Sequence, residues 1–433
     1  NNSNNNNSSN SSNNNNSNGF FGRFLPPIPP SIISSNSCKI CSKSINGRYL
    51  IINGDNYHTT CFVCSGCNNP IEGSYIPKES NDFYHETCYQ ELFSRKCDVC
   101  NKILVGKYLT HPFFKDLQHY CIQHQGNIKK CFACSTVESL TDAFPVIPDG
   151  RALCWNCIDT FIVDSSEAQP LYLEAVDFMQ NILGLPIPKL MREVPVLAVD
   201  LPSLNEQNNL QAQTGTSTHP NCPYDMDSLS RTGVPSGSVT RGLTLTTISQ
   251  VRYITPGNLL WGNLFQNHYH NNNTTTTNTR NFNHSTGSQF NFTTIELKRT
   301  CSVTAVLVLC GLPRHLATSI LAHEAMHVWC KLRPEPLLDL PLKIEEGLCQ
   351  YIAYQYLEHL QQMNQFNTQR NSSFSNSMLP WSEKLLPYFK YQIETDTSEV
   401  YGDGFREVAR CISIIGLDNF IDYISQNKSF PNL

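Results

Sequence analysis

The chain has 433 residues and a formal net charge of −5, with 31 Lys and Arg against 36 Asp and Glu. At roughly 100–200 residues per domain, this length allows two or three domains. The slightly acidic balance lacks the basic excess typical of nucleic-acid binding and the polybasic patch that binds anionic membranes. We therefore expect no nucleic acid and no membrane as partner.

Residues 1–36 are dominated by Asn and Ser, followed by Pro. Such a segment cannot bury enough apolar surface to fold, so we expect it to be disordered. It does not have the pattern of a signal peptide, and no apolar run reaches the ~20 residues of a membrane helix. These features favour a soluble protein in the cytoplasm.

Cysteines are concentrated in one part of the chain. Of the 19 cysteines, 13 fall between Cys38 and Cys157, mostly in C-x-x-C or H-x-x-C pairs. In a chain without a secretory signal, such pairs indicate metal ligands rather than disulfides. We expect the scattered remainder to be buried, inert thiols. They are Cys222, Cys301, Cys310, Cys330, Cys349 and Cys411.

The first eight ligand candidates form two quartets within residues 38–94. Each two-residue gap lets one tight knuckle offer two ligands to one metal, and four ligands close a tetrahedral structural zinc site. Only Phe62 and Val63 separate the two quartets, a spacing that closely resembles a LIM domain. The ligands are Cys38, Cys41, His58 and Cys61 in the first, and Cys64, Cys67, His85 and Cys88 in the second.

A second array over residues 95–160 predicts a divergent LIM-like module. Its quartets are separated by six residues, and His111 and His119 are alternative ligands. Such modules need metal to fold and have no open coordination position, so we expect them to be structural or to recognise a protein partner. The quartets are Cys97, Cys100, Cys121 and His124, then Cys131, Cys134, Cys154 and Cys157.

The remainder, residues 168–433, predicts one larger domain. Apolar spacing predicts a helix over 171–183, and β-branched residues predict strands over 194–199 and 243–248. Polar composition predicts a loop over 205–240 and a disordered Asn- and Thr-rich insertion at about 266–293. From Thr300 onward the apolar pattern predicts helices, which include 316–332, 344–360 and 400–415.

The sequence His323-Glu324-Ala325-Met326-His327 is the central motif of this domain. On a helix, His323 and His327 lie one turn apart on the same face, where both imidazoles reach one zinc ion. Glu324 is then placed to accept a proton from the water that attacks a peptide carbonyl. The alternative is a helix whose His residues make ordinary hydrogen bonds. The apolar flanks predict a buried helix, where such polar groups need a purpose.

A third zinc ligand and a transition-state stabiliser complete the expected site. Glu346 follows His327 after eighteen residues and precedes Gly347, a spacing that matches the gluzincin pattern. Its neighbour Glu345 is the alternative, which we expect to be a solvated residue in the first turn of a helix. Tyr401 resembles the gluzincin tyrosine that stabilises an oxyanion, with a packing role as the alternative. For Arg406 we favour a structural pairing with an acid.

The order of these modules resembles one family, the LIM-domain, ubiquitin-activated peptidases known as plant organ-size regulators of the DA-one type. The resemblance implies a cytosolic zinc endopeptidase that cleaves regulatory proteins, is activated by ubiquitination, and has ubiquitin or ubiquitin ligases as further partners. Residues 1–36 contain no acidic ubiquitin-interacting helix. The resembling stretches cover 96–100, 169–173, 240–243, 311–314, 319–327, 345–350 and 401–406.

We therefore predict a multidomain protein. Small LIM or zinc-ribbon modules, mostly β knuckles, precede an α+β zincin-like metallopeptidase domain that is mainly helical at its C-terminal end. About four structural zinc ions and one catalytic zinc ion are expected. Because the motif residues are all present, an active endopeptidase is favoured over a LIM scaffold with an inactive peptidase fold. An aminopeptidase is disfavoured, since no Gly-x-Met-Glu-Asn element is found.

Overall fold

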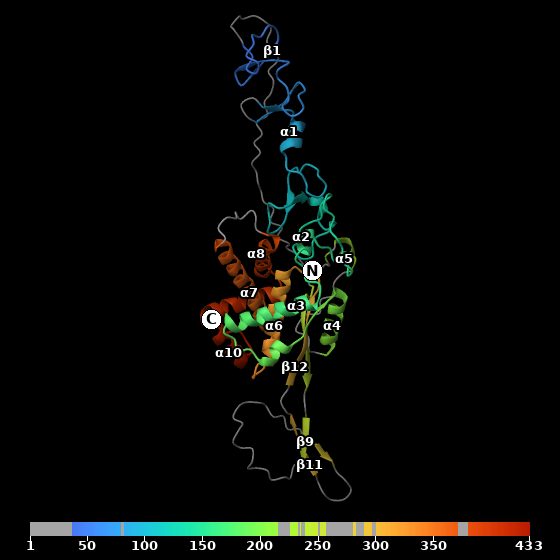
Figure 1. The fold of residues 1–433 in the computed structure, drawn as a ribbon, viewed down its shortest axis with the longest axis vertical. Coiled ribbons are helices and arrows are strands. Elements are labelled where there is room, and N and C mark those ends of the chain that lie inside the picture. Colours follow the sequence, from blue (N-terminus) through green and yellow to red (C-terminus); the bar gives the residue numbers. More distant parts are fainter. Residues whose placement is uncertain are drawn as a thin grey trace, which may run out of the picture. The chain divides into compact units, whose positions relative to one another are not determined.

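The computed structural model describes ten stretches of the chain. They are 37–78, 82–214, 226–232, 234, 239–249, 252–256, 280–282, 290–296, 300–370 and 380–433. The segment 1–36, predicted to be disordered, lies outside the described residues. The chain divides into two compact units, Asn1–Lys130 with Ser135–Phe144, and Cys131–Cys134 with Pro145–Leu433. Figure 1 shows the chain order by colour.

Among its described residues, the N-terminal unit contains short antiparallel hairpins and one α-helix, α1 (Glu86–Phe93). Asn53 and Gly54 connect the first hairpin, and both have the positive φ values, 52° and 91°, that a type I′ turn needs. The paired strands are β1 (Tyr49–Ile52) with β2 (Asp55–His58), β3 (Ile76–Pro77) with β4 (Phe83–Tyr84), and β5 (Tyr108–Thr110) with β6 (His119–Cys121), followed by the 3₁₀ turn η1 (Ile122–His124).

Aromatic residues form the core of the first module. Phe62 is fully buried and packs edge-to-face on Tyr57 and Tyr75, with ring centroids 5.9 and 5.2 Å apart. Its centroid lies 4.8 Å from that of Phe83. Because Phe62 stands directly between two ligand quartets, this small core holds both metal knuckles in register.

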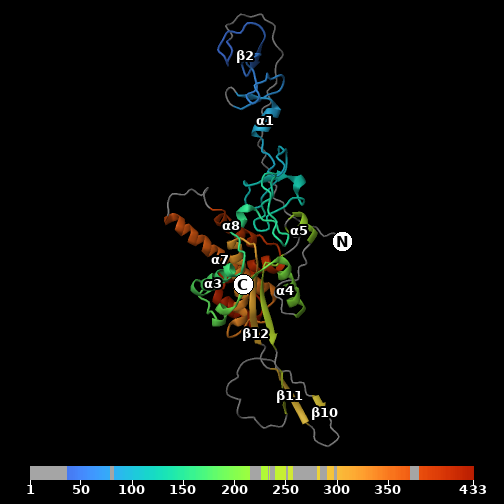
Figure 2. The same cartoon turned by 45° about the vertical axis from the view of Figure 1, so that its right-hand side comes forward.

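A three-stranded sheet in the order β7–β12–β8 lies in the C-terminal unit. The central strand β12 (Thr300–Leu309) is parallel to β7 (Val196–Val199) and antiparallel to β8 (Gly242–Ser249). A second antiparallel sheet is drawn beyond the end of β12 in Figures 1 and 2. Its strands are β9 (Arg252–Pro256), β10 (Arg280–Phe282) and β11 (Phe290–Glu296), in the order β10–β11–β9.

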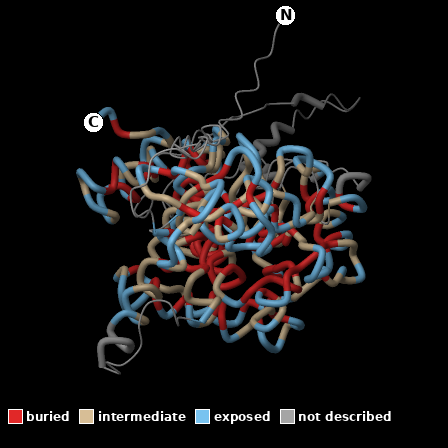
Figure 3. The backbone as a smooth tube through the Cα atoms, turned by 90° about the horizontal axis from the view of Figure 1, so that it is seen from above, coloured by how far each residue is buried: buried red, intermediate tan, exposed pale blue. Residues whose placement is uncertain are grey.

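Helices make up most of the C-terminal unit. Helix α6 (Arg314–Leu332) follows β12 and contacts α3 (Ser165–Asn181) and α7 (Leu342–Arg370). Buried residues are red in Figure 3. Within α6, every residue from Leu316 to Lys331 is buried except Ile320. The other helices and turns are α2 (Trp155–Ile158), η2 (Lys189–Glu193), α4 (Leu201–Thr214), α5 (Met226–Thr232), α8 (Trp381–Glu394), the π-helical turn η4 (Glu399–Asp403), α9 (Gly404–Ile415) and α10 (Leu417–Asn427).

Three expectations from the sequence differ from the structure. Residues 300–309 are the strand β12 rather than a helix, because a short, mainly apolar run fits a central strand equally well. The expected loop over 205–240 contains most of α4 and all of α5. Within the expected disordered insertion at about 266–293, residues 280–282 and 290–293 are in strands, and the rest lies outside the described residues.

Helix α4 escaped prediction because its inner face is partly polar. Leu204, Asn208 and Gln211 recur at helical spacing and are buried. The Asn208 amide donates to the Thr240 hydroxyl, and the Gln211 amide donates to the Thr244 carbonyl. These contacts replace the apolar stripe that sequence patterns detect. Within the described residues, no helix is long and apolar enough to span a bilayer.

Candidate zinc and active sites

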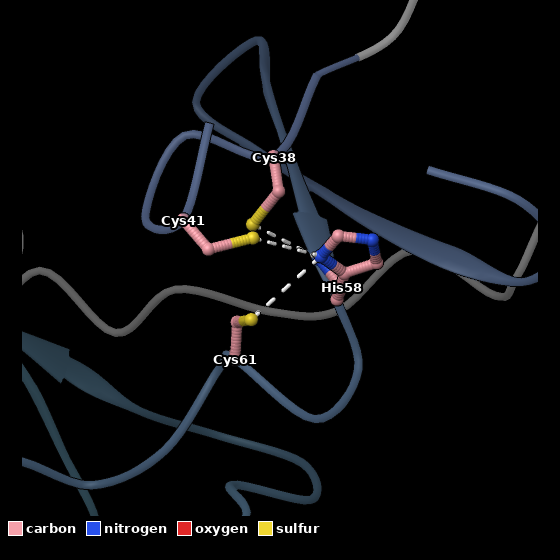
Figure 4. Close-up of side chains that lie close together, drawn as sticks. All are labelled: Cys38, Cys41, His58 and Cys61. Atoms are coloured by element: carbon pink, nitrogen blue, oxygen red, sulfur yellow. Dashed lines mark hydrogen bonds between the residues drawn. The ribbon is translucent and has the colours of Figure 1, made fainter. Parts of the chain in front are cut away.

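The first ligand quartet converges on one point in the N-terminal unit (Figure 4). The Sγ atoms of Cys41 and Cys61 lie 3.3 and 3.7 Å from Nδ1 of His58, and the His58 N–H approaches Cys38 Sγ at 3.4 Å. Burial opposes ionisation of Cys38, but N–H groups of Cys41 and His58 outweigh it and lower the Cys38 pKa to about 6. A thiolate is the form that binds zinc.

The other three predicted quartets also come together, each with ligand atoms within 4.8 Å of one another. Cys67 Sγ lies 3.4 Å from His85 Nδ1, Cys100 Sγ lies 3.8 Å from Cys121 Sγ, and Cys134 Sγ lies 3.6 Å from Cys154 Sγ. Sulfur and imidazole donors in sets of four suit structural zinc.

All four knuckles share one backbone feature. The residue after the second cysteine has a left-handed conformation, with φ between 56° and 62°. In the first three knuckles this residue donates its N–H to the carbonyl of the first cysteine at 2.7–2.8 Å. The turn points both thiols of each pair the same way. The four residues are Ser42, Asn68, Asn101 and Ser135.

The alternative ligands His111 and His119 have other roles. Nδ1 of His111 accepts hydrogen bonds from the N–H groups of Phe113 and Phe114. The ring of His119 packs edge-to-face on Tyr108, with centroids 5.5 Å apart. The third quartet is therefore closed by His124, as the spacing predicts.

The fourth quartet belongs to the C-terminal unit rather than to the hairpins that precede it. Both cysteine pairs lie in this unit, and the Phe132 N–H donates to the Ala152 carbonyl. Arg151, which is fully buried, donates to both Asp149 oxygens and to the Cys310 carbonyl at 2.7–3.0 Å. The sequence predicted that this quartet belongs to a LIM-like module over 95–160, whereas its residues are part of the same compact unit as the C-terminal domain.

The fifth cluster is formed by helices α6 and α7. Oε2 of Glu346 lies 3.0 Å from Nε2 of His323 and 3.6 Å from Nε2 of His327. Glu346 and His327 are fully buried, and His323 is 7% exposed. Two imidazole nitrogens and one carboxylate oxygen that converge below the surface fit a zinc ion with one coordination position open.

The opposite ring nitrogens are held by side chains that orient both imidazoles. Nδ1 of His323 lies 3.0 Å from Oε1 of Gln350, and Nδ1 of His327 lies 2.9 Å from Oε1 of Glu345. Glu345 also accepts a 2.9 Å hydrogen bond from Nζ of Lys331. Such partners fix the tautomer, so that Nε2 faces the metal position. The expectation that Glu345 is solvated was wrong, since it is only 9% exposed.

Glu324, the expected general base, is held by strand β8. The Thr244 hydroxyl donates to Oε2 of Glu324 at 2.7 Å. A Cβ atom on Gly242 would lie 2.6 Å from Oε1 of Glu324, so only glycine fits there without displacing the carboxylate. Both β8 residues were missed from the sequence because no local pattern links a strand residue to a helix eighty positions later.

Cys349 also faces the histidine pair. Its Sγ lies within 4.8 Å of the ligand atoms of His323 and His327, because it is one helical turn beyond Glu346. Burial raises the pKa of Cys349 to about 12. Two histidines and one glutamate are a donor set typical of catalytic zinc, and Oε2 of Glu346 lies 3.0 Å from Nε2 of His323, so we favour the Glu346 carboxylate as the third ligand.

Tyr401 lies beside the cluster, in the π-helical turn η4, with its ring centroid 6.4 Å from that of His323. A Cβ on Gly347 would lie 2.5 Å from the Gly404 backbone, so glycines allow α7 and α9 to approach closely at this point. Arg406 has the structural role that the sequence favoured, since it donates to Asp403 at 2.6 Å and to the Asp396 carbonyl at 2.8 Å.

An open cleft of about 380 Å³ leads to these side chains, a volume within the range of small-molecule and peptide-side-chain pockets. Its wall includes His323, Glu324 and Tyr401. The remaining lining residues are Phe132, Val234, Val239, Thr240, Arg241, Gly242, Leu316, Ser319, Ile320, Gln350, Phe389, Gln392, Ile393 and Asp396.

Comparison with known proteins agrees with this architecture. A model of the LIM domain matches residues 38–93, and a model of the DA1-like family, described as Protein DA1, matches residues 187–427. Protein DA1-related 1 and Protein DA1 of Arabidopsis thaliana are each 33% identical to this chain. These alignments cover 95% and 91% of the chain, and 69% and 68% of the relatives. LIM domain-containing protein HDR3 of Oryza sativa subsp. japonica is 33% identical over 91% of the chain and 74% of its own length.

The fold and the ligand clusters define a LIM-containing protein whose zinc-binding modules precede a largely helical domain. Within that class, the chain belongs to the DA1-like family.

Proposed function

We propose that the chain is a zinc-dependent endopeptidase with a zincin-like catalytic domain. The observation that carries the proposal is the convergence of His323, His327 and Glu346 below an open cleft whose wall includes His323 and Glu324. A carboxylate one residue after a zinc-ligating histidine on a helix is placed to act on water at the metal. The cleft provides the space that a substrate needs.

Each residue has a chemical task in this proposal. A bound zinc ion would supply Lewis-acid polarisation of the scissile carbonyl and of water. Glu324 accepts the proton from the attacking water and returns it to the leaving amine. Thr244 holds the Glu324 carboxylate in place through its hydroxyl. The Tyr401 hydroxyl stabilises the oxyanion that forms at the carbonyl.

A polypeptide substrate is favoured by the strand that borders the cleft. Gly242 lines the cleft at the start of β8. In the part of the chain that the structure describes, β8 pairs with β12 along one edge and lies at the end of its sheet. A strand at the end of a sheet is the kind of element to which an extended peptide can add a further strand.

The proposal assigns recognition of protein partners to the LIM modules, since four-ligand sites are closed and do no chemistry. Activation by ubiquitination, and contact with ubiquitin or ubiquitin ligases in the cytoplasm, form its regulatory part. They rest on the resemblance described above. Comparing cleavage by the ubiquitinated and unmodified chain tests this part directly.

The central test replaces Glu324 by Gln in the full-length chain. The change keeps size and hydrogen bonding but removes the proton acceptor, so cleavage should fall by about 10²–10⁴ with zinc content and melting temperature kept. His327→Ala should lose one zinc ion together with activity. Tyr401→Phe should keep the metal and lose only part of the rate.

Two outcomes would contradict the proposal. If Glu324→Gln cleaves a protein substrate as fast as wild type, the proteolysis arises elsewhere. If wild type cleaves nothing, even after ubiquitination, the chain acts instead as a LIM scaffold with an inactive peptidase fold.

A further inference from the structure

Arg241 occupies the wall of the cleft, immediately before β8 and next to Gly242, where an added Cβ would lie 2.6 Å from Oε1 of Glu324. Its guanidinium carbon lies 5.2 Å from the ring centroid of Phe132. It is partly buried, so it sits below the surface yet reaches the open cleft. No step of the proposed reaction uses this cation.

The two arginines that flank Phe132 have different surroundings. Arg151 lies 5.0 Å from the same ring and is neutralised by Asp149 at 2.7 Å. Arg241 has no carboxylate within 4.0 Å among the residues that the structure describes. Burial lowers the Arg241 pKa. Tyr388 opposes this shift, and the neighbouring Arg151 charge adds to it more weakly.

The acidic residues that share the cleft with Arg241 already have other contacts. Glu324 accepts the Thr244 hydroxyl, and an oxygen of Asp396 accepts the Ser398 N–H at 2.8 Å. A desolvated guanidinium without an anion costs free energy, which a ligand that brings a carboxylate would recover. Arginine is also the side chain best suited to bind a carboxylate through two parallel hydrogen bonds.

Phe132 gives this cation a fixed position. It stands between Cys131 and Cys134 of the fourth quartet and is 3% exposed. The ring is therefore held by a metal knuckle, and the guanidinium above it gains cation–π attraction. The cleft thus has a rigidly placed positive charge in the same wall as the expected general base.

We propose that Arg241 is a specificity-determining residue that binds a substrate carboxylate, so that the enzyme selects peptides with an acidic side chain close to the scissile bond. This inference rests on the proposed peptidase function. The same chemistry is offered by the C-terminal carboxylate of a peptide, and the experiment separates the two sources.

The test uses the full-length chain and a peptide library in which each position is in turn Glu or Gln, with every peptide made once with an amidated and once with a free C-terminus. Wild type should prefer Glu over Gln at one position by about 30-fold or more, as expected for a desolvated charge pair. Arg241→Gln should abolish the preference, and Arg241→Lys should keep part of it. Arg192→Gln, which alters an exposed arginine bonded to Gln180 and Asp177, is the matched control and should leave it unchanged.

The same peptides, labelled with a fluorophore, are then bound to Glu324→Gln, which separates recognition from cleavage. If binding is selective for acidic peptides and depends on Arg241, but wild type cleaves none of the peptides, this inference is upheld and the peptidase function is refuted. Cleavage with no acid preference, or with a preference that survives in Arg241→Gln, would overturn the inference alone. A preference confined to peptides with a free C-terminus would assign the terminal carboxylate as ligand and overturn the internal acidic residue. If Arg241→Gln has lost zinc or has a lowered melting temperature, the inference is judged from the Glu over Gln preference of wild type and of Arg241→Lys. No preference in wild type, or an undiminished preference in Arg241→Lys, would then overturn it.

Discussion

The hydroxyl of Thr244 donates a 2.7 Å hydrogen bond to Oε2 of Glu324, which joins strand β8 to helix α6 at the centre of the candidate active site. Both residues are buried, Thr244 completely and Glu324 to 1% exposure. A carboxylate at this depth is positioned by its partners rather than by solvent. The contact therefore links the sheet edge, where a peptide would lie, to the residue expected to move the proton.

We expect Thr244→Val to lower kcat by roughly 10- to 100-fold, the size of effect that small misplacements of catalytic groups produce. Valine keeps the volume and removes only the donor, so zinc content should not change. Thr244→Ser, which keeps the hydroxyl, should restore most of the rate. Equal kcat in Thr244→Val and wild type would show that Glu324 is held by other contacts.

A second prediction concerns the buried Glu345 carboxylate, which contacts both His327 and Lys331. Burial opposes ionisation of Glu345, but Lys331 and His327 outweigh it and lower the Glu345 pKa to about 2. Glu345→Gln should reduce zinc affinity at the catalytic position about 10- to 100-fold, because Glu345 orients His327. It should also cost about 3–5 kcal/mol of stability, since Lys331 stays buried without its carboxylate.

The double variant Glu345→Gln with Lys331→Met separates these two effects. Removing the stranded charge should recover much of the stability, measured by denaturant unfolding, while zinc affinity stays low. Recovery of both quantities together would mean that Glu345 acts through folding and not through orientation of the imidazole.

Metal content gives a third prediction. The four quartets and the His323, His327 and Glu346 cluster should hold about five zinc ions per folded chain, measured by elemental analysis. Cys131→Ser should lose one of them and also lower activity, because Phe132 of the same knuckle lines the cleft. Cys38→Ser should lose one and leave peptide cleavage close to wild type. Two or fewer ions in folded, unchelated wild type would contradict the count.

The sequence was most informative where ligands follow each other at fixed spacing. All four quartets could be predicted because a knuckle is a local structure, in which chain geometry alone brings two thiols together. The helix that contains His323 and His327 was predictable for the same reason, since residues four apart share a face. Glu346 came from a resemblance, and its place beside both histidines follows from the packing of α6 on α7.

What the sequence could not predict depends on tertiary packing. Thr244 meets Glu324 only because β8 lies beside α6, and no spacing rule encodes that contact. The strand β12 was taken for a helix, because a buried apolar run has the same composition in either structure. Gln350 could have been found, since it follows Glu346 by four residues on a helix and therefore shares its face.

The last prediction decides the third ligand of the catalytic zinc. Glu346 and Cys349 both approach the histidine pair, and their order along α7 puts them on one face. We favour the carboxylate, because Oε2 of Glu346 lies 3.0 and 3.6 Å from Nε2 of His323 and His327, and two histidines with one glutamate are a donor set typical of catalytic zinc. We expect Glu346→Ala to lose one zinc ion and all cleavage. Cys349→Ala should keep the metal and the rate and lose only about 1 kcal/mol of stability from a small cavity.

Cobalt substitution provides a readout independent of activity, since a thiolate ligand adds intense charge-transfer absorption that imidazole and carboxylate do not. With zinc kept in the four quartets and cobalt at the candidate catalytic site, Cys349→Ala should have the same absorption spectrum as wild type. A band that disappears in Cys349→Ala, together with one missing ion, would make Cys349 the ligand and leave Glu346 as its neighbour.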